Sequence, residues 1–312
     1  MSDPRPPHRP VLYNEIIHFL QPRRAGRYVD GTLGGGGHAS GILIASEPDG
    51  RLLGLDVDPE ALSLARDWLA HFGERAIVVQ ASYTTLRAQL DTLGWEMVDG
   101  ILLDLGISSL QLDTPARGFS FQNDGSLDMR FDPRSHIRAS DLINNLPEAE
   151  LSNLIFQYGE EKRSRQIARA IVLASPIYTT RQLANVVTSA TSSGRQGIHP
   201  ATRTFQALRI AVNQELDALV KVLPEAIDSL APGGRLAVIA FHSLEDRIVK
   251  QYFRQESTDC LCAPRQPVCT CGHKAAIKEV TRHPVRPAED EIRQNPRARS
   301  ARLRVAEKLS SG

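Results

Sequence analysis

The sequence has no apolar run long enough to cross a membrane, and it has no cysteine outside one short segment. A spanning helix needs about 18 or more consecutive apolar residues, and no stretch of this chain approaches that length. The start of the chain, rich in Pro and Arg, also lacks the apolar segment of a signal peptide. We therefore expect a cytoplasmic protein with no membrane partner.

Neither sign of charge is in excess, because 37 Lys and Arg stand against 36 Asp and Glu. This balance gives no sign of a polyanion bound over the whole surface, so an RNA partner must be inferred from local patches. One patch lies in residues 272–308, which hold ten Lys or Arg and five Asp or Glu. Four arginines crowd together in it: Arg297, Arg299, Arg302 and Arg304. Taken alone, the patch fits a solvated tail and a phosphate-binding surface about equally well.

The cysteines form two pairs, Cys260 with Cys262 and Cys269 with Cys271, and His273 follows them. A reducing cytosol argues against disulfides. A zinc site is conceivable, but zinc knuckles usually space their cysteines as C-x-x-C, whereas these pairs are C-x-C. The spacing favours a cysteine-bearing loop without a metal, and we predict no metal site.

The stretch from Arg27 to Gly41 is the most informative part of the chain. Residues 27–30 are typical of a short buried strand, and the four glycines Gly34–Gly37 forbid that strand from continuing. A helix is expected from about His38. Strand, glycine turn and helix together form the first unit of a doubly wound nucleotide-binding sheet. We expect a ligand to lie against the bare backbone of this turn.

Two ligands fit this turn. Gly34, Gly36 and Ala39 satisfy G-x-G-x-x-A, and Asp56 lies twenty residues beyond Gly36, which is the pattern of an NAD(P)-dependent oxidoreductase. However, Asp30 at the end of the first strand would repel a pyrophosphate and would attract a cation. S-adenosylmethionine, with its ammonium and sulfonium groups, is such a cation. These residues alone leave both ligands open.

Further strands are expected at residues 51–56, 76–80 and 98–104. Ligands of open α/β sheets bind at the carboxyl ends of the strands, so Asp56, Tyr83 and Asp104 should meet at one rim. Tyr83 can stack on a purine ring or simply close the core. A carboxylate at the end of a buried strand is costly without partners, which favours a binding or catalytic role for Asp104.

From about Asp113 to Pro200 the strand pattern stops. A long loop carrying Phe119 and Phe121 comes first, and helices are expected at about 148–158, 161–174 and 180–190. Basic side chains on the second helix would suit RNA phosphates beside an active-site rim. These are Lys162, Arg163, Arg165 and Arg169.

After this interruption the sheet pattern returns. One long helix is expected from about His199 to Leu223, with an apolar face packed on the sheet. A fifth strand at 235–241 precedes a helix for which Ser243 is the expected N-cap, and His242 can reach the rim. Residues 276–281 and 301–306 suggest a closing pair of strands. The pattern predicts a mixed α/β fold.

With these residues in view, the chain closely resembles the bacterial small-subunit (16S) rRNA cytosine-N4-methyltransferase family over nearly its whole length. Seven motifs in the expected order carry the resemblance. They are Asp30-Gly31-Thr32 with Gly36-Gly37-His38, Asp104 to Ser109, Arg117 to Phe121, Leu127 to Arg130, His199 to Gln206, Phe241 to Arg247, and Asn295 to Ser300. The place of an Asp/Asn-Pro-Pro-aromatic motif, common in amino-methyltransferases, is taken by Asp104-Leu105-Gly106-Ile107.

The resemblance implies a Rossmann-like class I methyltransferase sheet, residues 1–112 and 201–312, interrupted by a helical substrate-recognition insert, residues 113–200. It implies transfer of a methyl group from S-adenosylmethionine to a cytosine amino group of 16S rRNA near the decoding centre; the sequence leaves open whether naked rRNA or the assembled small subunit is the substrate. Carried over by position, the cofactor contacts are Gly36, Gly37, His38, Asp56, Tyr83, Asp104 and Gln111. Asp104 is also the catalytic candidate, since it could accept a hydrogen bond from the cytosine amino group, but the sequence does not separate this role from full engagement by the cofactor. The cysteine segment varies across the family, which argues against an essential metal.

Two other functions stay open, an NAD(P)-dependent oxidoreductase and a noncatalytic RNA-binding module. Calorimetry with both cofactors separates the first, since an oxidoreductase would bind NADH and not S-adenosylmethionine. The second predicts RNA affinity without methyl transfer. The sequence also leaves a homodimer open. In the expected reaction the target base leaves its stack, and the loop with Phe119 and Phe121 would hold it.

Overall fold

The structure, a computed structural model, describes residues 10–191, 199–263, 266 and 268–310. The chain folds into two compact units. The sheet unit comprises Met1–Gly106 and Asp217–Gly312, and the helical unit comprises Ile107–Leu216. Within the described ranges, no helix has the length and apolar character that a membrane crossing requires.

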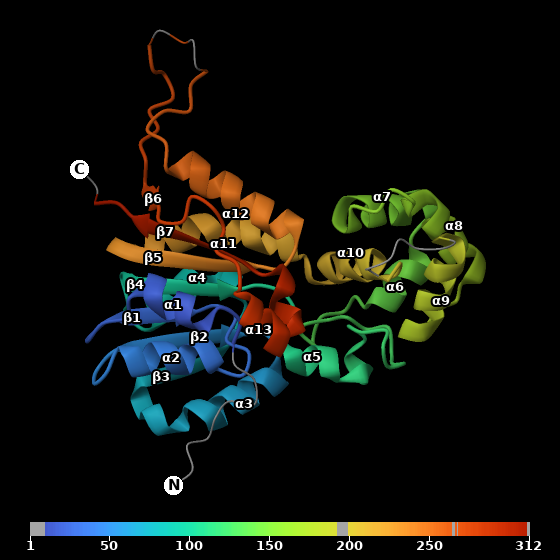
Figure 1. The fold of residues 1–312 in the computed structure, drawn as a ribbon, viewed down its shortest axis with the longest axis horizontal. Helices are drawn as coiled ribbons and strands as arrows, with labels where there is room; N and C mark the ends of the chain where they lie inside the picture. The colour runs from blue at the N-terminus through green and yellow to red at the C-terminus, as the bar shows by residue number, and fades with distance from the viewer. Residues whose placement is uncertain (1–9, 192–198, 264–265, 267, 311–312) are drawn as a thin grey trace. The chain divides into compact units, whose positions relative to one another are not determined.

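A seven-stranded sheet lies at the centre of the sheet unit, in the order β3-β2-β1-β4-β5-β7-β6 (Figure 1). The first five strands are parallel, and β7 pairs antiparallel with both β5 and β6. The strands are β1 Arg27–Asp30, β2 Arg51–Asp56, β3 Ala76–Gln80, β4 Val98–Asp104, β5 Leu230–Ala240, β6 Ile277–Glu279 and β7 Arg302–Lys308. The predicted first four strands, the fifth strand and the closing pair are all present.

Helices cover both faces of this sheet, as the apolar runs of β2 and β4 require. One buried cluster joins the sheet to α1 Tyr13–Leu20, α2 Gly37–Ala45 and α3 Pro59–Leu69. A second joins the other face to α4 Leu86–Thr92, α11 Glu215–Ser229 and α12 Ser243–Glu256. A short helix, α13 Glu289–Gln294, lies between β6 and β7 in the chain. The predicted Rossmann-like α/β class is confirmed.

Helix caps position two of these helices. The Asp58 carboxylate accepts the N–H of Glu60 at 3.0 Å, so α3 begins at Pro59 as predicted. For α12 the predicted cap, Ser243, is wrong by one residue. The N-cap is His242, and the Glu245 carboxylate accepts the N–H of His242 in return. The predicted capping box pairs Ser243 with Asp246, whereas the observed one pairs His242 with Glu245, one residue earlier. Both pairs have the spacing of a capping box, so the motif alone could not fix where the helix begins.

The helical unit holds six helices among its described residues, packed around one apolar core. They are α5 Ser109–Asp113, α6 Ala139–Asn145, α7 Glu148–Gly159, α8 Ser164–Ala174, α9 Thr180–Thr191 and α10 Thr202–Asn213. The three helices predicted between residues 148 and 190 are α7, α8 and α9. Phe119 is 6% exposed within this core and stacks on Phe131, with ring centroids 5.4 Å apart. The ring of Phe119 is therefore already packed, and the expectation that the loop carrying Phe119 and Phe121 holds the target base stays a prediction.

The prediction of a single long helix from His199 to Leu223 is also wrong. The chain breaks at Gln214, which adopts a left-handed backbone conformation with φ 50°. Just before it, the Asn213 side chain accepts the N–H of Phe131 and donates to the carbonyl of Met129. Because of this break α10 packs in the helical unit, whereas Leu219 and Leu223 of α11 pack on the sheet. A continuous apolar spacing cannot reveal a change of partner halfway along it.

Candidate active site

Three carboxylates end three neighbouring strands of the sheet unit. Asp30 closes β1, Asp56 closes β2 and Asp104 closes β4, and β1 lies between the other two. Burial raises the pKa of both Asp30 and Asp104, and a neighbouring charge adds to each shift, that of Asp56 for Asp30 and that of Asp30 for Asp104. The acids that end β2 and β4 thus lie on either side of Asp30, and the expectation that they meet Tyr83 at one ligand stays a prediction.

Asp30 is 1% exposed. Burial raises the pKa of its carboxyl to about 7, although its Oδ1 accepts the N–H of Thr32 at 3.2 Å, which acts in the opposite direction. The described residues provide no Lys or Arg ion pair for it. Its side chain therefore enters the rim without a compensating cation.

Asp56 ties the glycine turn to the end of β2. Its Oδ2 accepts the N–H of Gly34 at 2.8 Å, and its Oδ1 accepts the N–H of Asp58 at 2.9 Å. Burial still raises the pKa of the Asp56 carboxyl above its ordinary value. The carboxylate thus fixes the loop, and each oxygen keeps a second lone pair for a ligand hydroxyl.

The side chain of Asp104 has a raised pKa and one carboxylate oxygen without a hydrogen-bond partner among the described residues. Its side chain is 25% exposed, yet its Oδ1 is buried and has no hydrogen-bond partner among the described residues. Burial, followed by the charges of Asp30 and Glu245, raises the pKa of Asp104 well above its ordinary value. Its backbone N–H donates to Thr32 Oγ1 at 2.6 Å, which fixes the end of the strand against the glycine turn.

His38 lies in the first turn of α2, with Nε2 3.6 Å from Asp104 Oδ2. Burial lowers the pKa of the His38 imidazole to about 4, and the nearby backbone of Val11 offsets this only in part. His38 is therefore neutral at pH 7 and supplies no positive charge to Asp104. The separation exceeds ordinary hydrogen-bond length, so Asp104 is not satisfied by this ring.

These charges decide between the two ligands that fit the turn. Buried carboxylates without a cation are stabilised by a ligand that brings positive charge and donors. S-adenosylmethionine carries both, whereas the pyrophosphate of NAD would add negative charge beside Asp30, Asp56 and Asp104. The orphaned Oδ1 of Asp104 is the observation that best fits the cationic ligand.

The backbone of the glycine turn leaves room for such a ligand. A Cβ added to Gly35 would meet no atom within 4 Å, so the space above this residue is open. Gly36 has φ 82°, and a Cβ there would lie 3.2 Å from Leu69. A Cβ on Gly37 would lie 2.5 Å from the ring of Pro10. Gly36 and Gly37 thus allow close packing, while Gly35 faces open space.

The remaining two predicted cofactor residues fall in different places. Tyr83 follows β3 in a short 3₁₀ turn, Tyr83–Thr85. Its Cβ lies so near Gly31 that a Cβ added to this glycine would be 3.1 Å from it. Gln111 belongs to α5 of the helical unit and is 5% exposed. Its Oε1 accepts the N–H of Ser108 at 3.1 Å, which completes a capping box. Tyr83 therefore lies beside the loop after β1, while Gln111 has a local structural role.

Glu245 is a rim residue that the sequence did not single out. It is 2% exposed, its Oε2 accepts the N–H of Phe241 at 2.9 Å, and its Oε1 lies 3.1 Å from His242 Nε2. Its charge raises the pKa of Asp104. The motif Phe241 to Arg247 contained this acid, but a capping-box reading accounted for it without a site.

The C-terminal basic patch divides into two kinds of arginine. Arg302 and Arg304 both donate to the Asp246 carboxylate, at 2.9 and 2.7 Å, and Arg304 is 4% exposed. Arg304 is therefore structural, whereas Arg302, whose side chain is 35% exposed, is paired with Asp246 and also lines the pocket beside His242. Arg286 and Arg299 are exposed and line a pocket of about 310 Å³ beside His242. An anion at this pocket would meet guanidinium groups near the end of β5.

Comparison with known proteins identifies the family. The MraW methylase family matches residues 5–309. A ribosomal RNA small subunit methyltransferase H of Thermomicrobium roseum is 52% identical over 97% of this chain and 94% of its own length, and one of Geotalea uraniireducens is 52% identical over 97% and 98%. The solved structure of an rRNA methylase from Streptococcus thermophilus aligns with a TM-score of 0.41 at 11% identity, over 96% of this chain and 94% of that one. By family and by the electrostatics of its rim, this chain belongs to the MraW methylase family and is an S-adenosylmethionine-dependent methyltransferase.

Proposed function

We propose that this chain methylates the exocyclic N4 of one cytosine of 16S rRNA, near the decoding centre of the small ribosomal subunit. The carrying observation is the buried, unpaired Oδ1 of Asp104 at the rim, in a chain of this family. The names of the two relatives, each 52% identical to this chain, support the small-subunit rRNA substrate. Such subunits are found in the cytoplasm.

The cofactor site in this proposal comprises seven residues of the sheet unit: Gly36, Gly37, His38, Asp56, Tyr83 and Asp104, together with Asp30. S-adenosylmethionine supplies an electrophilic methyl group on a sulfonium. Asp56 hydrogen-bonds the ribose hydroxyls with its free lone pairs. The neutral His38 adds no positive charge to the rim, so the positive charge of S-adenosylmethionine would stabilise the ionised form of Asp30, whose pKa burial raises to about 7.

Asp104 orients the nucleophile. The cytosine amino nitrogen is a poor nucleophile because its lone pair is delocalised into the ring, so alignment supplies most of the rate. Asp104 accepts a hydrogen bond from the amino group and holds its lone pair toward the methyl. The raised pKa also makes Asp104 a stronger base for the proton that the amino group must lose.

RNA recognition is shared between basic groups of both units. In the sheet unit, exposed Arg286 and Arg299 line the pocket beside His242 and bind phosphate. In the helical unit, exposed Lys162, Arg165 and Arg169 add cations on or just before α8. The helical unit is the substrate-recognition insert in this proposal.

The test is transfer of labelled methyl groups to small subunits that lack this modification, followed by digestion and mapping of the modified nucleoside. We expect one N4-methylcytidine, and we expect Asp104→Ala to abolish its formation. Full activity of that variant would remove Asp104 from the reaction. Binding of the RNA without any methyl incorporation would support the noncatalytic module instead. Sedimentation of the active protein would show whether it is the homodimer that the sequence leaves open.

A further inference from the structure

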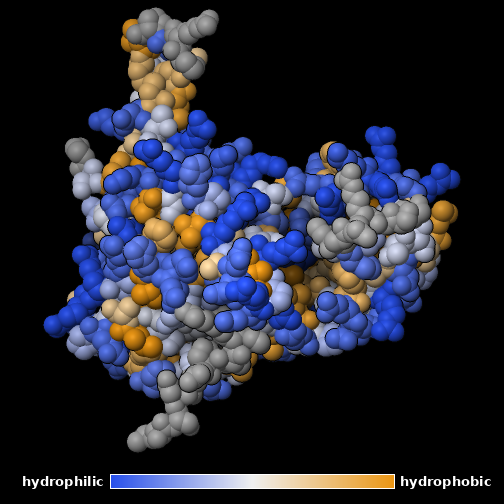
Figure 2. All heavy atoms as spheres, viewed as in Figure 1, coloured by the Kyte–Doolittle hydropathy of each residue, from blue (hydrophilic) through white to orange (hydrophobic). Residues whose placement is uncertain are grey.

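The described residues between α12 and β6, 257–263, 266 and 268–276, form a loop that extends away from the sheet (Figure 1). Its base is anchored, because Ala276 donates its N–H to the Glu256 carbonyl at 2.8 Å and accepts the N–H of Leu309 at 3.0 Å. Farther out, apolar side chains face solvent (Figure 2): Leu261 is 46% exposed and Val268 is 70% exposed. Burial of apolar surface therefore does not hold the outer part of this loop together.

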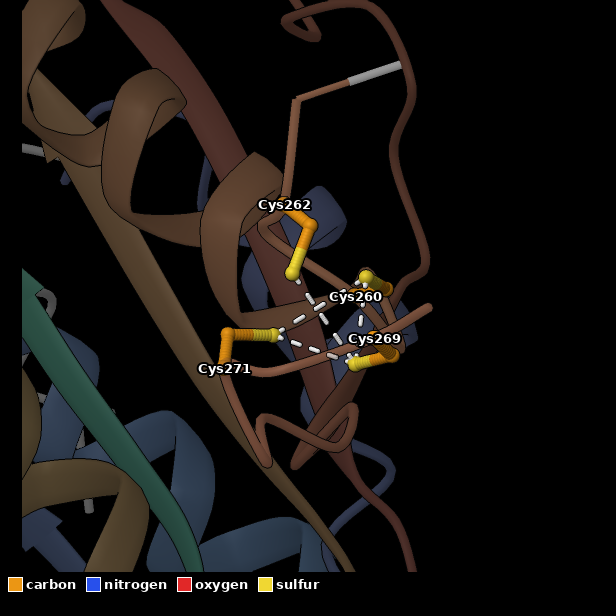
Figure 3. Close-up of side chains that lie close together, drawn as sticks. All are labelled: Cys260, Cys262, Cys269 and Cys271. Carbon is orange, nitrogen blue, oxygen red and sulfur yellow. Dashed lines mark hydrogen bonds between the residues drawn. The ribbon is translucent and has the colours of Figure 1, made fainter. Parts of the chain in front are cut away.

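All four cysteines of the chain meet in this loop (Figure 3). Their sulfurs point toward one another, although the two pairs come from opposite arms of the loop. Cys260 Sγ lies 3.5 Å from Cys269 Sγ and 3.8 Å from Cys271 Sγ. Cys269 Sγ lies 3.6 Å from Cys271 Sγ and 4.0 Å from Cys262 Sγ. The four sulfurs therefore form a compact cluster in which no two are joined.

These separations match one coordination geometry. A metal ion about 2.3 Å from each of four sulfurs at tetrahedral angles holds any two of them about 3.8 Å apart. The measured separations of 3.5–4.0 Å lie on both sides of that value. They are also far longer than the roughly 2.05 Å of a disulfide bond. The cluster therefore has the size of a four-thiolate metal site.

Backbone N–H groups support negative charge on these sulfurs. Leu261, the middle residue of the first pair, donates its N–H to Cys271 Sγ at 3.3 Å. Thr270, the middle residue of the second pair, donates its N–H to Cys262 Sγ at 3.4 Å. Each C-x-C pair thus solvates a sulfur of the other pair. Metals bind the thiolate, so donors aimed at sulfur favour the form that a metal requires.

We propose that Cys260, Cys262, Cys269 and Cys271 bind one Zn²⁺ ion in a closed tetrahedral site. Four thiolates are a ligand set typical of structural zinc, and they leave no open position for a substrate. The ion joins the two arms of a loop that has few other contacts. Its role is structural, and it is independent of the methyl-transfer reaction. The C-x-C spacing argued against this site only because a sequence does not show that two such pairs face each other.

The proposal is tested on the full-length protein, purified under reducing conditions without chelators. Elemental analysis should find about one zinc per chain. The double variant Cys260→Ser/Cys269→Ser, which removes one sulfur from each arm, should lose it. His273→Ala is the matched control, since its imidazole lies in the same loop and contacts the Gln255 carbonyl rather than the sulfurs. That control should keep the zinc, and loss of zinc from it would overturn the four-cysteine ligand set.

Replacement of zinc by Co²⁺ reports the geometry directly. Four thiolates should give the intense visible absorption of tetrahedral cobalt together with sulfur-to-metal charge-transfer bands in the near ultraviolet. Chelation should speed tryptic cleavage at Lys274, because the loop loses the ion that joins its arms. Reduced protein with less than about 0.1 zinc per chain, no tetrahedral cobalt spectrum and four freely reactive thiols would overturn the proposal.

Discussion

Asp104 and Asp246 are two acids of the same unit that meet opposite electrostatic conditions. Asp246 is 8% exposed, and burial by itself raises its pKa, but Arg304 and Arg302 outweigh this and hold the pKa below its ordinary value. Asp104 is enclosed without any such arginine, and its pKa is raised. Asp246 is thus paired within the protein and stabilises the fold. The lack of a partner for Asp104 is what its proposed role at the cofactor rim requires.

Removal of Asp246 should have the largest effect on stability. Asp246→Ala would leave Arg304, whose side chain is 5% exposed, as a buried charge without its carboxylate. We expect the free energy of unfolding to fall by about 3–5 kcal/mol, measured by guanidinium denaturation at pH 7. Asp217→Ala, on an exposed face of α11, is the control and should stay within about 0.5 kcal/mol of the parent. A loss below about 1 kcal/mol for Asp246→Ala would break the comparison.

Asp104→Asn should raise the free energy of unfolding, and by less than Asp246→Ala lowers it. In the absence of ligand it removes a carboxyl whose charged form is poorly stabilised, so unfolding should cost about 1 kcal/mol more at pH 7 while methyl transfer is lost. The raised pKa of Asp104 means that the folded state binds a proton more tightly than the unfolded state. The parent therefore loses stability as pH rises above about 4, and the variant should show less of this loss.

A matched control lies on the same strand. Asp99 of β4 has its carboxylate paired with the Arg23 guanidinium and the N–H of Arg27. Asp99→Asn should therefore lose stability or leave it unchanged, and it should keep methyl transfer. If Asp104→Asn proved less stable than Asp99→Asn across this pH range, the distinction between paired and unpaired acids would not hold.

The sequence predicted those parts of the fold that depend on local pattern. The strands ending at Asp30, Asp56 and Asp104 could be located because each is a short apolar run followed by a turn or helix signal. The cap of α3 could be located because Asp58 and Pro59 are adjacent. The expectation that Asp56, Tyr83 and Asp104 meet at one rim then followed from the geometry of parallel strands.

The parts that were missed depend on contacts between distant residues. Arg304 resembled part of an RNA-binding patch because its partner, Asp246, lies more than fifty positions away. The break at Gln214 depends on Asn213 reaching the loop at Phe131. The four sulfurs likewise meet only when the loop folds back on itself. No periodicity or spacing reports such pairings.

Proton release on cofactor binding tests the central claim most directly. Asp30 has a pKa of about 7, so the free protein carries a proton on it in much of the population at pH 6–7, and a cationic ligand should displace that proton. The raised pKa of Asp104 acts in the same direction. Titration calorimetry in buffers of different ionisation heat should show protons released when S-adenosylmethionine binds at pH 6–7. The affinity for S-adenosylmethionine should rise by up to about tenfold per pH unit for each proton released. S-adenosylhomocysteine, whose sulfur is uncharged, should release fewer protons. Binding without proton release, at an affinity independent of pH, would contradict the account.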